Sequence, residues 1–158
     1  MTDPRPAPSK PVAAPAVLAN APGYQARRLY QAYLAAWVKT VDSTLTGPQF
    51  AVLTTVDSAP GNDQSSMASA VALDTSTMAD IARRLEHRGL LERRTAADDG
   101  RRKLLYLTEE GVRVLREANE RARALDEQLF GSYAGDERTE LLRQLTTLAD
   151  YWEKLRED

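Results

Sequence analysis

The sequence predicts a mainly α-helical protein with one small β-hairpin, and two observations lead to this fold class. Apolar side chains recur every three to four residues along most of the 158-residue chain, which is typical of helices that bury one face. After Gly89 the apolar period falls to two. There LLERR and KLLYLT flank the turn-rich loop TAADDGR, a pattern typical of two antiparallel strands.

The N-terminal part of the chain divides into a tail and a helix. Residues 1–22 hold six prolines and few large apolar groups. Such a segment does not offset the entropy lost on ordering, so we expect a mostly disordered tail. From Gly23 an apolar stripe at helical spacing runs through Tyr33 and Trp37, which predicts a long helix within residues 23–45.

Three further helices and the hairpin are predicted within residues 46–108. The motif TGP at 46–48 opens a helix, because proline is favoured in the first helical turn. A short helix over about 63–72 follows. Asp74 is a good N-cap for the third helix, and Gly89 ends that helix.

Two long helices are predicted in residues 109–158. Thr108 caps the first, which runs to about Phe130, and the second spans about 136–156. Their leucines repeat at three- and four-residue spacing, and a 20-residue helix is about 30 Å long. Helices of this length need a partner surface, so we expect them, with the first helix, to form a two-fold homodimer. Packing within one chain alone is the alternative.

The composition excludes several kinds of site. The absence of cysteine excludes disulfides, thiolate zinc sites, iron–sulfur clusters and a cysteine nucleophile. The single histidine, His87, excludes a multi-histidine metal site and lies in the last turn of its helix, where the dipole favours a cation. We therefore expect neither a metal nor a cofactor.

The sequence predicts a cytoplasmic protein. No stretch approaches the ~18 consecutive apolar residues that a membrane-spanning helix needs. Residues 1–22 lack the compact apolar core of a secretory signal.

The formal net charge of −2 hides an uneven distribution. Residues 83–103 hold eight basic and four acidic groups, a net +4, whereas residues 1–82 carry a net −1 and residues 104–158 a net −5. The basic excess covers the end of one helix and the hairpin. A near-neutral total therefore does not argue against nucleic acid, because phosphates respond to a local basic patch.

The helix that follows Asp74 has the residues expected of a helix that enters the DNA major groove. It starts with the small hydrogen-bonding residues Thr75, Ser76 and Thr77. Arg83 and Arg84, further along, are predicted to contact phosphates or guanine edges. This helix and the short one before it are typical of a helix-turn-helix. The alternative is that Thr75, Ser76 and Thr77 act only as caps.

The hairpin carries a cluster of cations, namely Arg93, Arg94, Arg101, Arg102 and Lys103. A hairpin tip can deliver an arginine to a narrow minor groove, where negative potential is concentrated. A helix-turn-helix followed directly by a basic hairpin is a winged helix. The predicted fold is therefore a winged helix-turn-helix with the hairpin as its wing, plus long dimerisation helices. A merely solvated charged face is the alternative for the hairpin.

The stretches LTGPQFAVL, ALDTSTMADIARRLEHRGLLERR and DDGRRKLLYLTEEG, over about 46–111, resemble the multiple-antibiotic-resistance regulator (MarR) family of bacterial winged-helix repressors. Asp99 and Arg101 match the Asp-x-Arg of that family's wing. The resemblance implies that Arg101 enters the minor groove and that Asp99 helps to hold it by an ion pair. Gly100 stands where the family often has arginine, which removes one expected phosphate contact.

The first helix concentrates aromatic residues beside arginine. A pocket with an aromatic wall and one arginine suits a small planar carboxylate, because rings stack and a guanidinium pairs with the acid. The resemblance implies a ligand site between the dimerisation helices and the winged helix, lined by Arg28, Tyr30, Tyr33, Trp37, Gln49 and Phe50. The alternative is that the aromatics belong to the core or the dimer interface and that Arg28 is a surface residue.

We therefore expect a non-enzymatic, dimeric transcriptional regulator of aromatic compound catabolism. It would repress from a pseudo-palindromic site in double-stranded DNA and be released by a small anionic aromatic ligand, a phenolic or heteroaromatic carboxylate. One alternative is a DNA-binding module that responds to no ligand. Another is a small enzyme acting on an aromatic acid, although the sequence shows no nucleophile–base pair or metal cluster.

Overall fold

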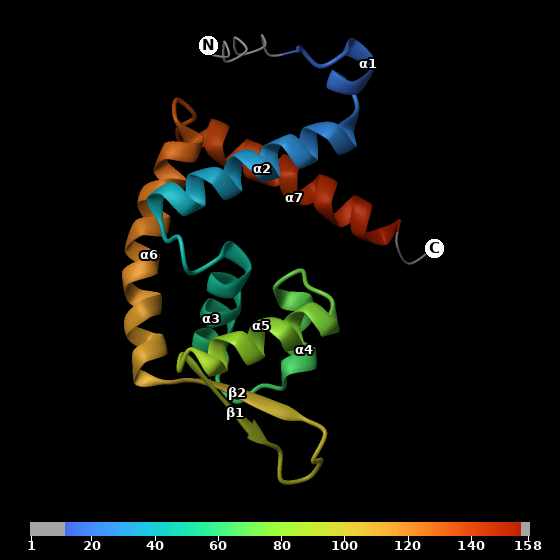
Figure 1. Cartoon of the computed structure of the whole chain (residues 1–158). Coiled ribbons are helices and arrows are strands. Elements are labelled where there is room, and N and C mark those ends of the chain that lie inside the picture. The colour runs from blue at the N-terminus through green and yellow to red at the C-terminus, as the bar shows by residue number, and fades with distance from the viewer. Residues whose placement is uncertain (1–11, 156–158) are drawn as a thin grey trace, which may run out of the picture. The chain divides into compact units, whose positions relative to one another are not determined.

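The computed structural model describes residues 12–155 (Figure 1). It divides into two compact units, one ending at Ala35 and the other beginning at Ala36. The first unit contains the one-turn helix α1 (Ala16–Ala19) and most of α2 (Pro22–Thr40). The tail predicted for residues 1–22 lies outside the described residues up to residue 11. From Ala16 the structure differs from that prediction, because the Pro15 carbonyl accepts hydrogen bonds from Leu18 and Ala19 and starts a helical turn of alanine-rich sequence.

The second unit holds the end of α2 and every later element. In chain order these are α3 (Gly47–Ser58), α4 (Gln64–Ala70), α5 (Thr75–His87), β1 (Leu91–Thr95), β2 (Lys103–Leu107), α6 (Glu109–Phe130) and α7 (Asp136–Lys154). Thr46, Asp74 and Thr108 are N-caps with side-chain hydrogen bonds to the first turn of α3, α5 and α6. Thr46 also forms a capping box with Gln49. Gly89 follows α5 with a φ of +72°, which confirms it as the residue that ends this helix.

The core of the second unit lies where α3, α5 and β2 meet. Seven side chains with no exposed surface come from these three elements: Val52, Leu53 and Val56 from α3, Met78, Ala82 and Leu85 from α5, and Leu105 from β2. On α5 these residues recur at spacings of three and four, so one face is buried and the opposite face carries polar side chains. Burial of one face therefore fixes which face of α5 points to solvent.

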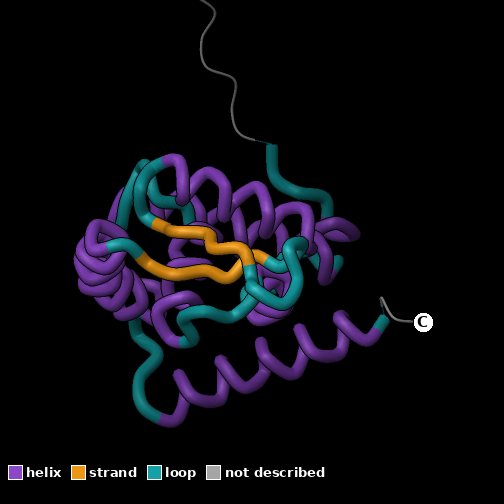
Figure 2. Tube along the Cα trace, turned by 90° about the horizontal axis from the view of Figure 1, so that it is seen from below, coloured by secondary structure: helices purple, strands orange, loops and turns teal. Residues whose placement is uncertain are grey.

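The hairpin is anchored at its base and open at its tip. The strands are antiparallel, from Leu91 opposite Leu107 to Thr95 opposite Lys103, and Figure 2 shows them side by side with the connecting loop at one end. Leu105 also exchanges hydrogen bonds with the loop before α4, accepting from Gly61 N (2.8 Å) and donating to Asn62 O (3.1 Å). Three helices with a hairpin docked in this way confirm the predicted winged helix-turn-helix.

Helix α6 begins directly against the end of α5. The Thr108 hydroxyl donates to Gly89 O (2.6 Å), and Thr108 N donates to Leu90 O (3.2 Å). Gly111, in the first turn of α6, is buried, and a Cβ built on it would lie 2.1 Å from Leu90 O. Only a residue without a side chain fits this approach of two backbones.

Helix α7 buries little of its own surface. None of its described residues is buried, and Leu142, Leu145, Leu148 and Tyr151 are each more than two-fifths exposed. Arg138 joins it to the end of α6 by an ion pair with Glu127 (2.7 Å) and by stacking on Phe130 (4.4 Å to the ring centroid). An amphipathic helix with an exposed apolar face can bind a partner through that face.

Candidate nucleic-acid interface

Helix α5 begins with three hydroxyl residues, and two of them, Ser76 and Thr77, bond to its cap. Asp74 accepts from Thr77 N (2.8 Å), from the Ser76 hydroxyl (2.5 Å) and from the Thr77 hydroxyl (2.6 Å). These hydrogen bonds, first those from the Ser76 and Thr77 side chains, hold the pKa of the Asp74 carboxyl well below its usual range. Ser76 and Thr77 therefore do support the cap, and their oxygen lone pairs remain for other partners.

Thr77→Ala is expected to relax base preference more than it reduces non-specific DNA affinity, because a base contact carries sequence information and a phosphate contact does not. The hydrogen bond that the Thr77 backbone N–H donates to the Asp74 cap survives the change. Binding to a duplex library with each position varied measures the preference, and Thr54→Ala on α3, whose hydroxyl also bonds within its own helix, is the control. Uniform weakening across all sequences would mean that Thr77 only supports the cap.

The two arginines predicted on α5 differ in their partners. Arg83 forms an ion pair with Asp80, one turn earlier on the same helix. Arg84 is exposed, and no residue in the described part of the chain pairs with its guanidinium. The full charge of Arg84 is therefore available to a phosphate or a base, whereas that of Arg83 is partly neutralised.

The wing cations show the same contrast. Arg94 makes a two-point contact with Glu92 (3.0 and 2.9 Å) and lies over the Tyr106 ring (4.4 Å to the centroid). Arg102 pairs with Asp98 (3.0 Å), and Lys103 donates to the Thr95 hydroxyl (2.7 Å). Among the wing cations of residues 93–103, Arg101 alone has no side-chain partner within the described residues, and it lies in the exposed loop.

Asp99 does not make the ion pair with Arg101 that the resemblance implied. Its carboxylate accepts instead from the backbone N–H of Arg101 (2.9 Å), and the ion pair of the loop is Arg102 with Asp98. The carboxylate therefore shapes the turn that presents Arg101 and leaves the guanidinium unpaired.

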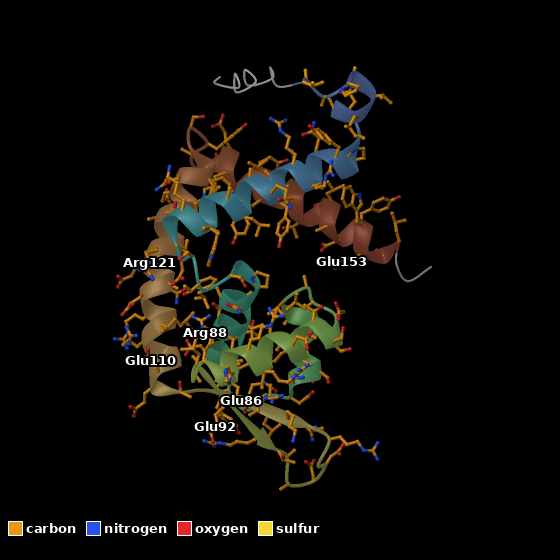
Figure 3. All side chains as sticks on the ribbon, viewed as in Figure 1. Glu86, Arg88, Glu92, Glu110, Arg121 and Glu153 are labelled. Carbon is orange, nitrogen blue, oxygen red and sulfur yellow. The ribbon has the colours of Figure 1, made fainter. Side chains whose placement is uncertain are left out.

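One contact at this surface was not predicted from the sequence. Arg93 of β1 pairs with Glu86 of α5 (2.6 Å), and with its side chain only about one-fifth exposed it joins the wing to the helix. Figure 3 labels Glu86. Arg93 is thus a structural residue of the hairpin base. Nothing in the sequence indicated that Glu86 would make this contact, since an acidic residue among cations is typical of an ordinary solvated surface.

The predicted ligand residues fall in both units. In the first, Tyr30 and Tyr33 stack with their ring centroids 6.4 Å apart, and Arg28 is exposed. In the second, Trp37 is 3% exposed, donates its indole N–H to Leu45 O (2.6 Å) and packs on Phe50 at 5.1 Å between centroids. In this structure Trp37 is a core residue, as the alternative for the aromatic stripe expected.

Gln49 is the predicted ligand residue that lines a cleft. The cleft has a volume of about 560 Å³ and runs between the start of α3 and the second half of α5. Its lining residues are Thr44, Gln49, Asp80, Arg83, Arg84, His87 and Arg88. Arg88, which was not among the predicted site residues, donates to Thr44 O (2.9 Å) and to Gln49 Oε1 (3.2 Å). The cleft wall is rich in cations, which favours an anionic occupant.

Residues 12–155 contain neither of two further features. No helix there is long and apolar enough to cross a membrane. No group of three or more metal-ligating side chains is found in the same range.

Comparison with known proteins gives a consistent result. The model of the MarR family matches residues 45–103. The chain is 35% identical over 128 residues to the transcriptional regulator HosA of Escherichia coli O127:H6, covering 81% of this chain and 93% of HosA.

Solved structures extend the likeness to nearly whole chains. The PcaV transcriptional regulator from Streptomyces coelicolor, in complex with its natural ligand, is 40% identical, with a TM-score of 0.82 over 88% of this chain and 98% of PcaV. BpsR of Bordetella bronchiseptica, whose DNA binding is regulated by 6-hydroxynicotinic acid, is 29% identical, with a TM-score of 0.73 over 80% of this chain and 97% of BpsR.

Proposed function

The chain belongs to the MarR family of transcriptional regulators, and from that premise we propose that it is a homodimeric repressor released from its operator by a small aromatic acid. Members of this family are DNA-binding proteins without enzymatic activity, so the chain is a DNA-binding regulator and the expectation of no enzyme is confirmed. The repressor role, the dimer, the ligand class and the contact residues are the proposal.

The observation that carries the proposal for DNA is the pair of unneutralised arginines, Arg84 on α5 and Arg101 on the wing. We propose that α5 enters a major groove with Thr75, Ser76 and Thr77 toward the bases and that the wing places Arg101 in the flanking minor groove. Carboxylates partly neutralise Arg83, Arg94 and Arg102, so these arginines have a smaller role near phosphates. Lys103 bonds to a neutral hydroxyl and adds its full positive charge there. Asp99 acts through the turn that it shapes.

The proposal for a homodimer rests on α7. Its exposed leucines recur at three-residue spacing, and a second copy would cover them in a two-fold arrangement. Two α5 helices related by such an axis would read half-sites about one DNA turn apart, which makes the operator a pseudo-palindrome. Sedimentation equilibrium gives the oligomeric state, and a monomer at micromolar concentration would contradict the proposal.

The ligand class is supported by the relatives and by the residue chemistry. BpsR responds to 6-hydroxynicotinic acid, a heteroaromatic carboxylate, and PcaV was solved with its natural ligand. In this chain Arg28 supplies a guanidinium on the same helix as the stacked Tyr30 and Tyr33. Gln49 supplies an amide at the cationic cleft, and Phe50 the ring that packs on the buried Trp37.

A footprint on the DNA upstream of the protein's own coding sequence tests the whole proposal. We expect a symmetric protected region of two half-sites that disappears when a phenolic or heteroaromatic carboxylate is added. Protection that no acid of such a panel reverses would favour a regulator without a ligand. Conversion of an acid by the purified protein would favour the enzyme, and absence of any protection on this DNA or on random duplexes would contradict DNA binding.

Arg28→Ala is expected to leave operator affinity unchanged and to abolish release by an anionic aromatic ligand, because a carboxylate loses its guanidinium partner. Operator binding titrated with each acid measures the response. Arg27→Ala is the matched control, since Arg27 is its neighbour and lies over the Tyr24 ring (5.7 Å). A normal response in Arg28→Ala would remove Arg28 from the ligand site.

A further inference from the structure

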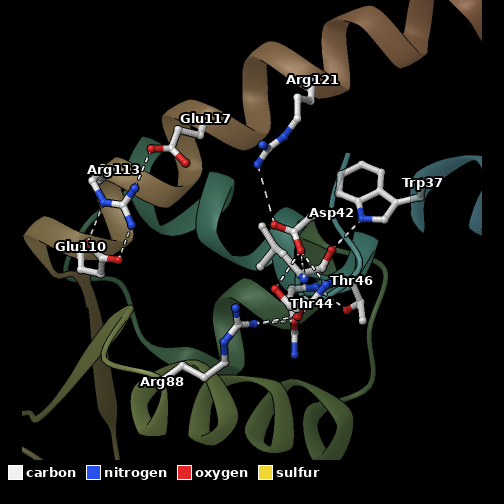
Figure 4. Close-up of polar contacts among 11 residues, drawn as sticks. Trp37, Asp42, Thr44, Thr46, Arg88, Glu110, Arg113, Glu117 and Arg121 are labelled. Atoms are coloured by element: carbon white, nitrogen blue, oxygen red, sulfur yellow. Dashed lines mark hydrogen bonds and ion pairs between the residues drawn. The ribbon is translucent and has the colours of Figure 1, made fainter. Parts of the chain in front are cut away.

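The connection between α2 and α3, residues 41–46, is tied to helices on three sides; we call it the 41–46 loop (Figure 4). From α2, the buried Trp37 indole donates to Leu45 O (2.6 Å). From α6, Arg121 lies 3.8 Å from the Asp42 carboxylate, which itself accepts from the backbone of Thr44 and Leu45 (2.5 and 2.9 Å). The loop is therefore held as one shape by its own hydrogen bonds and by the helices on either side.

The third connection runs to α5 and includes the hydrogen bonds of one side chain, that of Arg88. Arg88, the C-cap residue at the end of α5, donates through Nη1 to Thr44 O (2.9 Å) and to Gln49 Oε1 (3.2 Å) (Figure 4). The sequence separations of 44 and 39 residues make these tertiary contacts. Arg88 and both acceptor residues line the cleft between α3 and α5.

The acceptors of Arg88 are fixed in place. Gln49 is 8% exposed, and its Oε1 also accepts from Thr46 N (3.1 Å) in the capping box of α3. Thr44 O belongs to the loop that Asp42 holds. A guanidinium is always charged and has a rigid planar set of donors. Its hydrogen bonds to two fixed acceptors therefore fix both the orientation of the guanidinium and its distance from them.

We propose that Arg88 is a positioning residue for operator binding. It fixes the C-terminal end of α5 to the 41–46 loop and so sets the angle at which α5 projects relative to α6 and the end of α2. The proposal rests on the proposed function, since it concerns how two α5 helices of a dimer meet DNA. It separates Arg88 from Arg84, which lines the same cleft without a partner among the described residues.

The test uses an operator selected from a random duplex library by the wild-type chain, together with versions that carry one base pair more or one fewer between the half-sites. A rigidly held α5 discriminates among these spacings, because half-site separation is a geometric property of the dimer. In Arg88→Gln we expect about tenfold weaker binding to the selected operator, the equivalent of one hydrogen bond to a charged group. We also expect a smaller affinity ratio between the selected and altered spacings.

Arg84→Gln is the contrasting variant, with the same change in charge on the same helix. It is expected to reduce the salt dependence of log affinity by about one unit for each phosphate that is no longer bound, while keeping the spacing ratio. Arg88→Gln is expected to keep the wild-type salt dependence. A reduced salt dependence in Arg88→Gln, or a wild-type spacing ratio, would overturn the proposal, the first by making Arg88 a phosphate-binding residue.

A second pair of variants keeps the proposal testable if Arg88→Gln lowers stability. Gln49→Glu preserves the capping box and gives Arg88 an acidic partner, so the spacing ratio should rise above the wild-type value. In the Arg88→Gln background the same change should have no effect on the ratio. Equal effects of Gln49→Glu in both backgrounds would show that the two residues act independently. If the wild-type chain selects no duplex, the proposed function fails and not this inference alone.

Discussion

Replacing Gly111 by alanine is expected to destabilise the protein by about 3 kcal/mol, the upper part of the usual range for overpacking. The added Cβ would lie 2.1 Å from Leu90 O, a backbone atom that cannot rotate away. Leu90 O also accepts from Thr108 N, so the clash falls at the joint between α5, β1 and α6. Thermal unfolding should show a midpoint lower by roughly 6–12 °C.

Gly23→Ala is the matched control for this change. Gly23 also lies within a helix, but nothing lies within 4 Å of a Cβ built on it. Alanine there should raise stability by up to about 1 kcal/mol, because glycine is the poorer helix former. A stabilising effect at both positions would mean that α6 does not approach Leu90 as closely as the structure has it.

Arg101→Ala is expected to weaken operator binding by about tenfold to a hundredfold. Arg101 is the wing cation without a side-chain partner in the described range, and Asp99 holds the turn that presents it through the backbone. The salt dependence of log affinity should fall by about one unit for each phosphate that the variant no longer neutralises. Fluorescence anisotropy of a labelled operator at several salt concentrations measures both quantities.

One further variant separates charge from shape at this position, and a second is a control on another element. Arg101→Lys keeps the charge and should keep the salt dependence while reducing affinity, since lysine lacks the planar fork of donors. Arg123→Ala removes an exposed cation from α6, away from the wing, and should change neither quantity. An Arg101→Ala protein that binds like wild type would remove the wing tip from the interface.

The helices and strands could be predicted from the sequence because the residues that indicate them lie close together in the chain. Asp74 and Thr108 cap helices by bonds to backbone groups three residues away, and Gly89 ends α5 through its own positive φ. The hairpin follows from a change of apolar period that any short window reveals. The one-turn helix α1 was not predicted from the sequence, because the proline-rich composition of residues 1–22 outweighed the helix preference of its four residues.

Only part of the candidate site could be predicted from the sequence. Residue type and order indicated the hydroxyl start of α5 and the cationic wing, but not which cations are already paired. Arg93 with Glu86, Arg94 with Glu92 and Arg102 with Asp98 remove three of the wing cations from the free set, and Lys103 bonds to Thr95, which leaves Arg101. The sequence left open whether Trp37 lines a ligand site or the core, and the structure buries it, with its indole N–H donating to Leu45 O.

The sequence by itself determined the helices, the hairpin, the caps and the basic segment, because these depend on backbone hydrogen bonds and apolar periods within a few residues. Only the tertiary structure decided that Gly111 meets Leu90 and that Arg88 reaches Gln49 and Thr44 across 39 and 44 residues. The physical reason is that these contacts depend on how α3, α5 and α6 dock. Docking is set jointly by the side chains buried between the helices, and no single stretch of sequence encodes it.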